Sequence, residues 1–179
     1  SETVATVDLA DKEAVNKAIE DYSKLSDRAK EIEKTDYEHL VELQKELNRL
    51  ENEIADFKKL NSLSRSKTVE DVKSSDLDLI NGVFAEYDKL SSKAKTALAN
   101  EKKHLDELLA AAEAKKKAEE EEARVQAEVT NFKIDNAYIL SRTNESVQSN
   151  DLDAINKALA DYDKLSDKAK EALKDTKAK

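Results

Sequence analysis

A ten-residue motif occurs three times in the chain, and this repetition limits what the chain can fold into more than any other feature. The copies read DYSKLSDRAK from Asp21, EYDKLSSKAK from Glu86 and DYDKLSDKAK from Asp161. Their tyrosines lie at positions 22, 87 and 162, so the spacing is shorter between the first two copies than between the last two. Repeats of this length are typical of arrays in which one supersecondary unit is stacked several times.

A second pair of landmarks locates the segment that makes the later spacing longer. An H-L-x-E-L motif begins at His39 and again at His104, with the shorter spacing, whereas Phe57 and Phe132 show the longer one. The extra residues therefore lie between His104 and Phe132, where the sequence reads AKKKAEEEEA from Ala114. We predict a first helical repeat, a second with a lengthened connecting helix, and a truncated third that packs on the tail of this helix, with bounds 1–65, 66–141 and 142–179.

The composition favours a fold made of helices alone. The chain has no proline, cysteine, methionine or tryptophan, it has one glycine, and 40% of its residues are charged. Alanine, leucine, lysine and glutamate favour helices, and turns must form without the residues that usually mark them. The apolar residues recur with helical spacing, which argues against disorder despite the high charge. The predicted fold class is all-α.

The first helix of each repeat shows an apolar stripe at positions i, i+3, i+4 and i+7. In the first repeat the predicted helix covers about residues 11–24. Asp76 and Asp151 precede the stripes of the second and third repeats and are the expected N-caps. The stripe residues are Val15, Ala18, Ile19 and Tyr22, then Ile80, Val83, Phe84 and Tyr87, then Ile155, Ala158, Leu159 and Tyr162.

The repeated motif itself predicts a corner between two helices. A leucine closes the first helix, and the serine after it is expected to cap the first amides of a short second helix. We expect the leucine to be buried and a small alanine to let the corner pack closely. These residues are Leu25, Leu90 and Leu165, Ser26, Ser91 and Ser166, and Ala29, Ala94 and Ala169.

The third helix of each repeat is the longest, and its apolar seam indicates that it packs against other helices. Steps of three and four positions connect Leu40, Leu43, Leu47, Leu50, Ile54 and Phe57. Such spacing is typical of a heptad seam. In the second repeat we predict one helix from about Glu101 to Ser141. Its central stretch AKKKAEEEEA has no apolar face, and ion pairs such as Glu113–Lys117 and Glu120–Arg124 are expected to stabilise it.

Together these elements predict an elongated, spectrin-like rod of tandem three-helix bundles joined by shared long helices. The head of each long helix packs in its own repeat, and its tail packs on the next. We expect the rod to be monomeric. The expected breaks lie near Ser26 and Thr35, between residues 66 and 75, at Ser91, between residues 143 and 150, and at Ser166.

The residue types that carry chemistry do not form a recognisable catalytic or metal motif. His39 and His104 occupy equivalent places in different repeats, and neither has the second histidine that a helical zinc site needs. We predict no metal, no cofactor, no catalytic residue and no enzymatic activity. Tyr37 and Tyr138 fit the apolar seams less well than the other aromatic residues, and an exposed tyrosine can anchor a protein contact.

Charge and hydropathy argue against two classes of partner. A net charge of −9 with interleaved acids and bases does not suit nucleic acid. No apolar run approaches the roughly 20 residues of a membrane span, so no membrane insertion is expected. The chain begins SETVATVDLA, without an initiator methionine. We interpret it as a fragment of a longer protein, from which targeting and anchoring signals are expected to be missing.

The first repeat resembles helical repeats of large surface proteins of Gram-positive bacteria. Those repeats read D-K-x-x-V, then a Y-x-x-L-[ST]-x-x-x-K corner, then a leucine-rich helix that begins near Y-x-x-L. The second repeat departs from the pattern, with Ser75–Asp76 for the D-K pair and Lys102 for the later tyrosine. The matching residues are Asp11, Lys12, Val15, Tyr22, Leu25, Ser26, Lys30, Tyr37 and Leu40.

The resemblance implies an extracellular, cell-wall-anchored location and two alternative functions. One is a structural stalk that projects another domain from the cell. The other is an adhesin module that binds a host plasma or matrix protein through exposed helical faces. Outward positions drift between repeats, as at Ser23, Asp88 and Asp163, which favours the stalk. The matching positions are structural, so no partner-binding residue is assigned.

Overall fold

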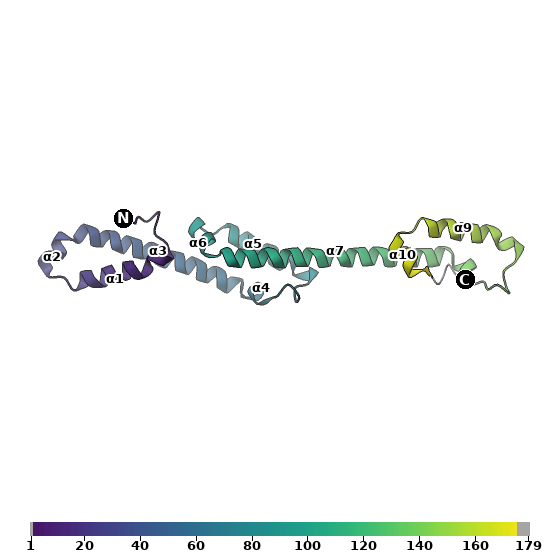
Figure 1. The fold of residues 1–179 in the computed structure, drawn as a ribbon, viewed down its shortest axis with the longest axis horizontal. Helices are drawn as coiled ribbons and strands as arrows, with labels where there is room; N and C mark the ends of the chain where they lie inside the picture. Colours follow the sequence, from purple (N-terminus) through teal and green to yellow (C-terminus); the bar gives the residue numbers. More distant parts are fainter. Residues whose placement is uncertain (1, 175–179) are drawn as a thin grey trace. The chain divides into compact units, whose positions relative to one another are not determined.

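A computed structural model describes residues 2–174, and every regular element in this range is a helix (Figure 1). The prediction of an all-α fold is confirmed. The chain divides into two compact units, Ser1–Glu113 and Ala114–Lys179. No helix in the described range is long and apolar enough to cross a membrane.

The helices recur with the same two spacings as the sequence repeat. Each repeat contributes a short 3-10 helix, a helix of twelve residues and a helix of six. In chain order these are η1 Leu9–Asp11, α1 Lys12–Ser23, α2 Asp27–Ile32, η2 Ser74–Asp76, α5 Leu77–Asp88, α6 Ser92–Ala97, η3 Ser149–Asp151, α9 Leu152–Asp163 and α10 Asp167–Ala172.

Two long helices follow the first and second corners. Helix α3 covers Lys34–Leu60 with 27 residues, and α7 covers Ala99–Asp135 with 37. They begin and end at equivalent positions of the repeat, so the insertion lies wholly inside α7. The stretch from Ala114 is helical throughout.

The prediction that this helix continues to Ser141 is wrong, because it ends at Asp135 and the short helix α8 Ala137–Leu140 follows. The break occurs at Asn136, whose buried side-chain amide donates to the Phe132 carbonyl at 3.0 Å. Asn61 makes the same bond to Phe57 at 2.7 Å, and the helix α4 Ser62–Ser66 follows it. A side chain that bonds the backbone four positions earlier competes with helix continuation.

The predicted serine caps are confirmed in all three corners. Ser26, Ser91 and Ser166 have extended backbone, and each hydroxyl oxygen accepts from the amide three positions later. These N···O distances are 3.4, 3.2 and 3.3 Å. One orphan donor of each short helix is thereby satisfied without glycine or proline.

Asp76 and Asp151 occupy the N-cap positions of their helices as predicted, although their side chains do not cap the helix amides. Both residues directly precede their helices, but neither carboxylate bonds to the amides of α5 or α9. They bond backward instead, to the N–H of Lys73 at 2.8 Å and of Gln148 at 2.9 Å. Each carboxylate thus closes the 3-10 turn that leads into its helix, and this bond directs it away from the amides ahead.

The first unit holds three apolar clusters along its helices. One joins Val7 and Val15 to the head of α3, and a second joins Val72 and Ile80 to the head of α7. The third joins the tail of α3 to the second corner. Its buried members are Leu50, Ile54, Phe57, Val83, Tyr87, Ala94, Leu98 and Leu105.

The second unit repeats this last cluster at the tail of α7. Val129 and Phe132 of α7 pack with Tyr162 of α9 and with Ala169 and Leu173 of the third corner. The T-shaped ring pair Phe132–Tyr162, with centroids 6.0 Å apart, matches Phe57–Tyr87 at 5.8 Å in the first unit. Both corners therefore share a Phe–Tyr ring pair, a buried alanine and a buried leucine.

The leucine expected to be buried at each corner is not the principal core residue. Leu25 is exposed, and Leu90 and Leu165 are half-buried. Leu98 and Leu173, just after the short helices, are fully buried instead. Leu90 packs against the cluster as a partly buried residue and is not one of its buried members.

The first corner differs from the other two. Glu33 occupies the position of Leu98 and is exposed, and the neighbouring Ile32 is 74% exposed. Tyr22 stacks on Tyr37 with ring centroids 4.0 Å apart. Tyr37, which fits the apolar seam poorly in the sequence, therefore packs against an aromatic neighbour.

The charged stretch of α7 is exposed along most of its length. Lys116 and Glu120 form an ion pair at 4.0 Å. The predicted pair of Glu120 with Arg124 is not formed, because Arg124 bonds Glu121 and Glu128 at 2.9 and 3.0 Å. Arg124 therefore joins the end of the charged stretch, at Glu121, to Glu128 in the apolar tail.

Substitution of the buried corner leucine should cost far more than substitution of the half-buried one. We expect Leu98→Ala to lower the free energy of unfolding by about 2–5 kcal/mol. Leu90→Ala should cost roughly 1–2 kcal/mol, because only part of its area is removed from water. Urea titration followed by circular dichroism measures both. Leu63→Ala is the control, with 59% exposure and an expected effect below about 0.5 kcal/mol. Equal effects at all three positions would contradict the described core.

The exposed stretch should exchange its amide protons faster than the packed parts of α7. Exposed ion pairs contribute only about 0.2–0.5 kcal/mol each, and salt screens them. We expect residues 115–122 to exchange faster than those around Leu108 and Phe132, and faster still at high salt, in hydrogen-exchange mass spectrometry. Uniform protection along α7 would show that something covers this stretch.

Candidate helix-docking sites

The second corner is tied to α3 by one carboxylate. Glu53 accepts hydrogen bonds from the Ser91 backbone N–H and, at 2.9 Å, from the Ser91 hydroxyl. The third corner has the same tie to α7, where Glu128 accepts from the Ser166 N–H at 2.9 Å. The serine that caps the short helix thus also joins it to the preceding long helix.

A set of charged side chains surrounds each of these ties. Arg49 bridges Glu46 and Glu53 along α3, and Lys93 of the second corner lies 3.8 Å from Glu46. In the second unit Arg124 bridges Glu121 and Glu128, and Lys168 lies 3.4 Å from Glu121. The shared signature on the two long helices is E-x-x-R-[LV]-x-x-E-[IV]-x-x-F, which begins at Glu46 and Glu121.

The hydrogen bonds at the ties shift the acidity of both glutamates. Burial raises the pKa of Glu53, but the bonds from Ser91 and the charge of Arg49 together lower it by more, so this pKa lies below its usual value. Bonds from Ser166, reinforced by Arg124, lower the pKa of Glu128 against a smaller effect of burial. Both carboxylates are therefore stabilised in the charged form that the serine donors need.

The sequence carries a signal for this tie that our sequence analysis did not use. The two glutamates and the arginine of the signature recur at the spacing that relates Phe57 to Phe132. Charged residues are so frequent in this chain that their recurrence alone does not indicate a role. The role of Glu53 and Glu128 follows from the serine N–H groups that donate to them. In the first repeat the equivalent corner residues, Ser26 and Arg28, are exposed.

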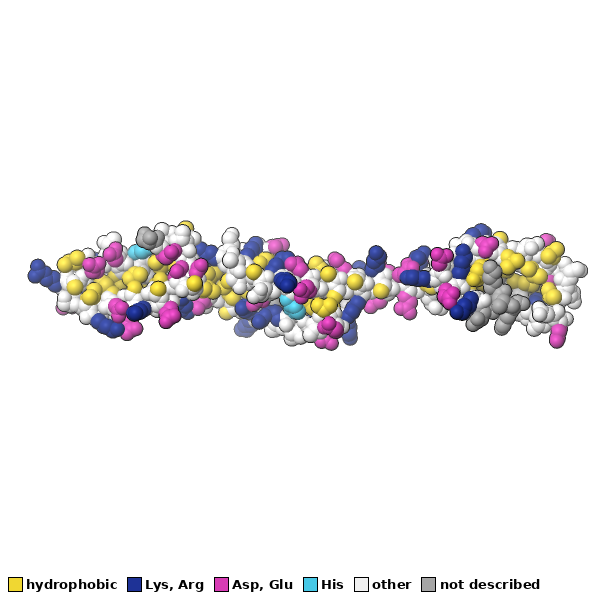
Figure 2. Space-filling view, in the orientation of Figure 1, with side chains coloured by type: hydrophobic (Ala, Val, Ile, Leu, Met, Phe, Trp, Pro, Cys, Tyr) yellow, Lys and Arg dark blue, Asp and Glu magenta, His cyan; other side chains and the backbone are white. Residues whose placement is uncertain are grey.

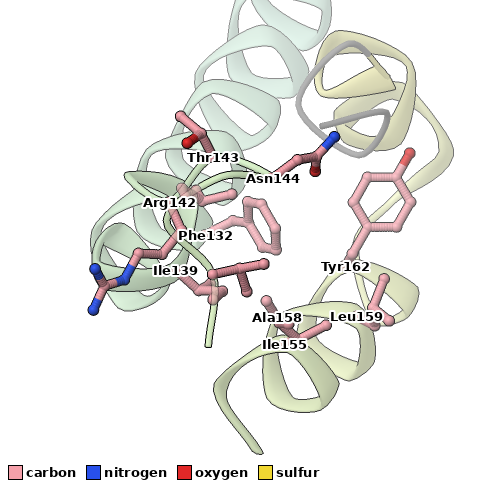
Figure 3. Close-up of a pocket in the computed structure, with 11 residues that line it drawn as sticks. Phe132, Ile139, Arg142, Thr143, Asn144, Ile155, Ala158, Leu159 and Tyr162 are labelled. Carbon is pink, nitrogen blue, oxygen red and sulfur yellow. The ribbon is translucent and has the colours of Figure 1, made fainter. Parts of the chain in front are cut away.

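A groove lies on the third repeat, with a cavity of about 300 Å³. Phe132 forms its floor from α7, and Ile155, Ala158 and Leu159 of α9 face it from the opposite wall (Figure 3). The loop after α8 completes the lining with Arg142, Thr143, Asn144 and Val147. In the space-filling view apolar side chains remain visible in this part of the chain (Figure 2).

The same surface is covered in the first two repeats. Val7 and Val72 are fully buried, whereas the equivalent Val147 is 40% exposed. The cover in the first repeat is Leu43 and Leu47 of α3, and in the second it is Leu108 and Ala112 of α7. The groove of the third repeat is thus the surface on which the head of a long helix rests in the other repeats.

A polar network holds the side chain of Arg142, one of the residues that line the groove. The Tyr138 hydroxyl donates to Asp151 Oδ1 at 2.7 Å and accepts from Arg142 Nη2 at 2.6 Å. Asp151 is only 2% exposed, and the bonds from Tyr138 and from the Gln148 N–H lower its pKa. Tyr138 itself is 55% exposed, so its ring is on the surface while its hydroxyl bonds Asp151 and Arg142.

The two histidines make equivalent structural contacts rather than forming a shared site. His39 Nε2 donates to the Glu2 carbonyl at 2.8 Å, and His104 Nε2 donates to the Lys67 carbonyl at 3.0 Å. Each bond joins the head of a long helix to the segment that precedes η1 or η2. Within residues 2–174, no cluster of histidine and acidic side chains is arranged to hold a metal ion.

Comparison with known proteins adds no relative. No family model, curated protein or solved structure matches the chain. The resemblance to Gram-positive surface repeats therefore remains a prediction from the residues of the motif.

The stabilising effect of the Glu53 tie should disappear in acid. A group whose folded-state pKa is lowered stabilises the fold above its unfolded-state pKa and loses this effect as the pH falls through the folded-state value. We expect Glu53→Gln to be less stable than the parent at pH 7, and the difference to shrink below about pH 4.

Thermal melts at several pH values measure this difference. Glu86→Gln is the control, because it removes the same charge from a glutamate that, among residues 2–174, forms its ion pair with the nearby Lys89. A Glu53→Gln effect that stays constant from neutral to strongly acidic pH would contradict a charged tie.

Proposed function

We propose that the chain is a non-enzymatic structural spacer, a stalk region of a bacterial surface protein that projects another domain from the cell. In this proposal the repeats form tandem three-helix bundles that share their long helices, in the manner of spectrin-like rods. The location and anchoring follow from the sequence resemblance, and the spacer role follows from the physical arguments below.

The observation that carries the proposal is that one joint is built twice with the same bonds. A corner serine, a glutamate of the preceding long helix and an arginine one helical turn before that glutamate recur in both units. A chain that needs only a defined spacing is expected to repeat its joints and to let its outward residues vary. Repetition of buried and joint positions with drift outside therefore favours a mechanical role.

The extra residues of α7 support a role in setting distance. An insertion of about ten residues adds about 15 Å of helix at 1.5 Å per residue. These residues have no apolar face, so they contribute length and no core. An insertion with this composition changes the length of helix between two packed segments. It leaves the packing of each segment unchanged.

The non-enzymatic part of the proposal is supported by the way the charged groups are engaged. The charged side chain among the groove-lining residues, Arg142, is joined to Asp151 through Tyr138. The carboxylates with lowered pKa values at the joints accept bonds from Ser91 and Ser166. General acid–base catalysis calls for groups whose pKa lies near the working pH, and these lie on the acidic side.

One observation favours the second candidate function, an adhesin module that binds a host plasma or matrix protein. The groove of the third repeat exposes Leu159 by 46% and Val147 by 40%, next to a fixed arginine. Exposed apolar surface with a polar rim is typical of protein-binding sites. A pulldown of plasma and matrix proteins on the chain, compared with a Leu159→Lys variant, tests this candidate.

A distance measurement tests the spacer. The chain has no cysteine, so Lys103→Cys and Lys133→Cys, both at exposed positions of α7, introduce two unique spin-label sites. A rigid helix predicts a narrow distribution centred at about 45 Å for labels about 30 residues apart. Deletion of residues 114–123 should move the centre to about 30 Å. A broad distribution in the parent chain would show that α7 bends and sets no distance.

A further inference from the structure

The groove of the third repeat has a well-defined counterpart in each of the other two repeats. Val147 and Ile155 are the counterparts of Val7 and Val15, and of Val72 and Ile80, by the spacing of the repeat. The four counterparts are at most 5% exposed. What buries them is an apolar helix face, so the chain itself shows which kind of occupant this surface takes.

The two occupants share a sequence signature. The head of α3 reads HLVELQKEL from His39, and the head of α7 reads HLDELLAAA from His104. Both fit H-L-x-E-L-x-x-x-[LA]. In each, the second leucine and the last residue are buried, with exposures of 3% and 1% at Leu43 and Leu47, and of 0% at both Leu108 and Ala112. These residues lie one helical turn apart, on one face.

The third repeat also has a residue at the position whose carbonyl accepts from the signature histidine in the other two repeats. His39 and His104 bond the carbonyl oxygens of Glu2 and Lys67. The residue at this position in the third repeat is Arg142, which lines the groove. The Arg142 side chain bonds Tyr138 and lies 3.6 Å from Asp151, so the residue is held from two sides before any helix arrives.

We propose that the groove of the third repeat is a docking site for an amphipathic helix with the signature H-L-x-E-L-x-x-x-[LA]. The two apolar residues of the helix fill the cavity over Val147, Ile155 and Leu159. The histidine donates to the Arg142 carbonyl, as its equivalents do elsewhere. This inference does not depend on the proposed spacer function, because it rests on the equivalence of the three repeats alone.

Titration of a helical peptide against the full chain tests this proposal. The probe is a synthetic peptide of residues 34–52, stapled between positions 45 and 49, which are exposed in α3. The readout is methyl NMR of the chain with labelled isoleucine, leucine and valine. We expect saturable shifts at Val147, Ile155 and Leu159, and none at Val72 or Ile80, whose surface is already covered.

Variants on both sides identify the contact. Peptides with Leu43→Asp or His39→Ala should bind at least about tenfold and about threefold more weakly, respectively. On the chain, Leu159→Lys should weaken binding at least about tenfold. Since Leu159 is 46% exposed, this variant should fold, and an unchanged circular dichroism melt verifies it. Leu152→Lys, at a 58% exposed position of the same helix outside the groove lining, is the matched control and should bind as the parent does.

Three results would overturn the proposal. One is the absence of groove shifts at about 1 mM peptide, far above the micromolar range of ordinary specific contacts. Another is chemical-shift changes confined to Val72 and Ile80. They would mean that the peptide displaces the head of α7 from the second repeat and does not bind the groove. The third is binding of the Leu43→Asp peptide with the same affinity as the parent peptide. It would show that the groove does not recognise the apolar face of the helix.

Discussion

Each of the second and third serine corners is packed and hydrogen-bonded against the tail of the long helix that precedes it, and the rest of the structure depends on this contact. It fixes where the short helix begins, since the same serine caps that helix and bonds Glu53 or Glu128. It also gives each long helix two tasks, because its head fills one apolar cluster and its tail another. Helix α3 therefore connects two separate cores, with Leu43 and Leu47 in one and Leu50, Ile54 and Phe57 in the other.

The corners are built without unusual backbone. Within residues 2–174 no residue has a positive φ angle, and the single glycine, Gly82, lies inside α5. Turns are made instead from serine hydroxyls, from carboxylates that bond backward as at Asp151, and from asparagine amides as at Asn136. Each of these devices satisfies a backbone group that a helix end would leave unpaired.

The periodicity of the apolar residues predicts the helices and their order. Which of these residues is buried depends on tertiary contacts, and the sequence pattern does not show them. The stripes, the serine caps and the place of the insertion follow from local spacing, and the structure has them. Leu90 and Leu98 both fit a helical period, and only the path of the chain decides which of them is buried against α3. The groove cannot be predicted from the sequence, because Val147 and Ile155 fit the same apolar pattern as the buried residues of the other repeats. Only the structure shows that no helix among residues 2–174 covers them.

The order of the contact along the chain has a consequence for biosynthesis. The tail of α3 leaves the ribosome before α5 and α6, and the tail of α7 before α9 and α10. Each new corner therefore emerges after the helix tail that it packs against and after the carboxylate that accepts from its serine. Folding can proceed from the first repeat to the last without waiting for distant segments. An array of this kind can grow by gene duplication at its C-terminal side without a change in how the earlier repeats fold.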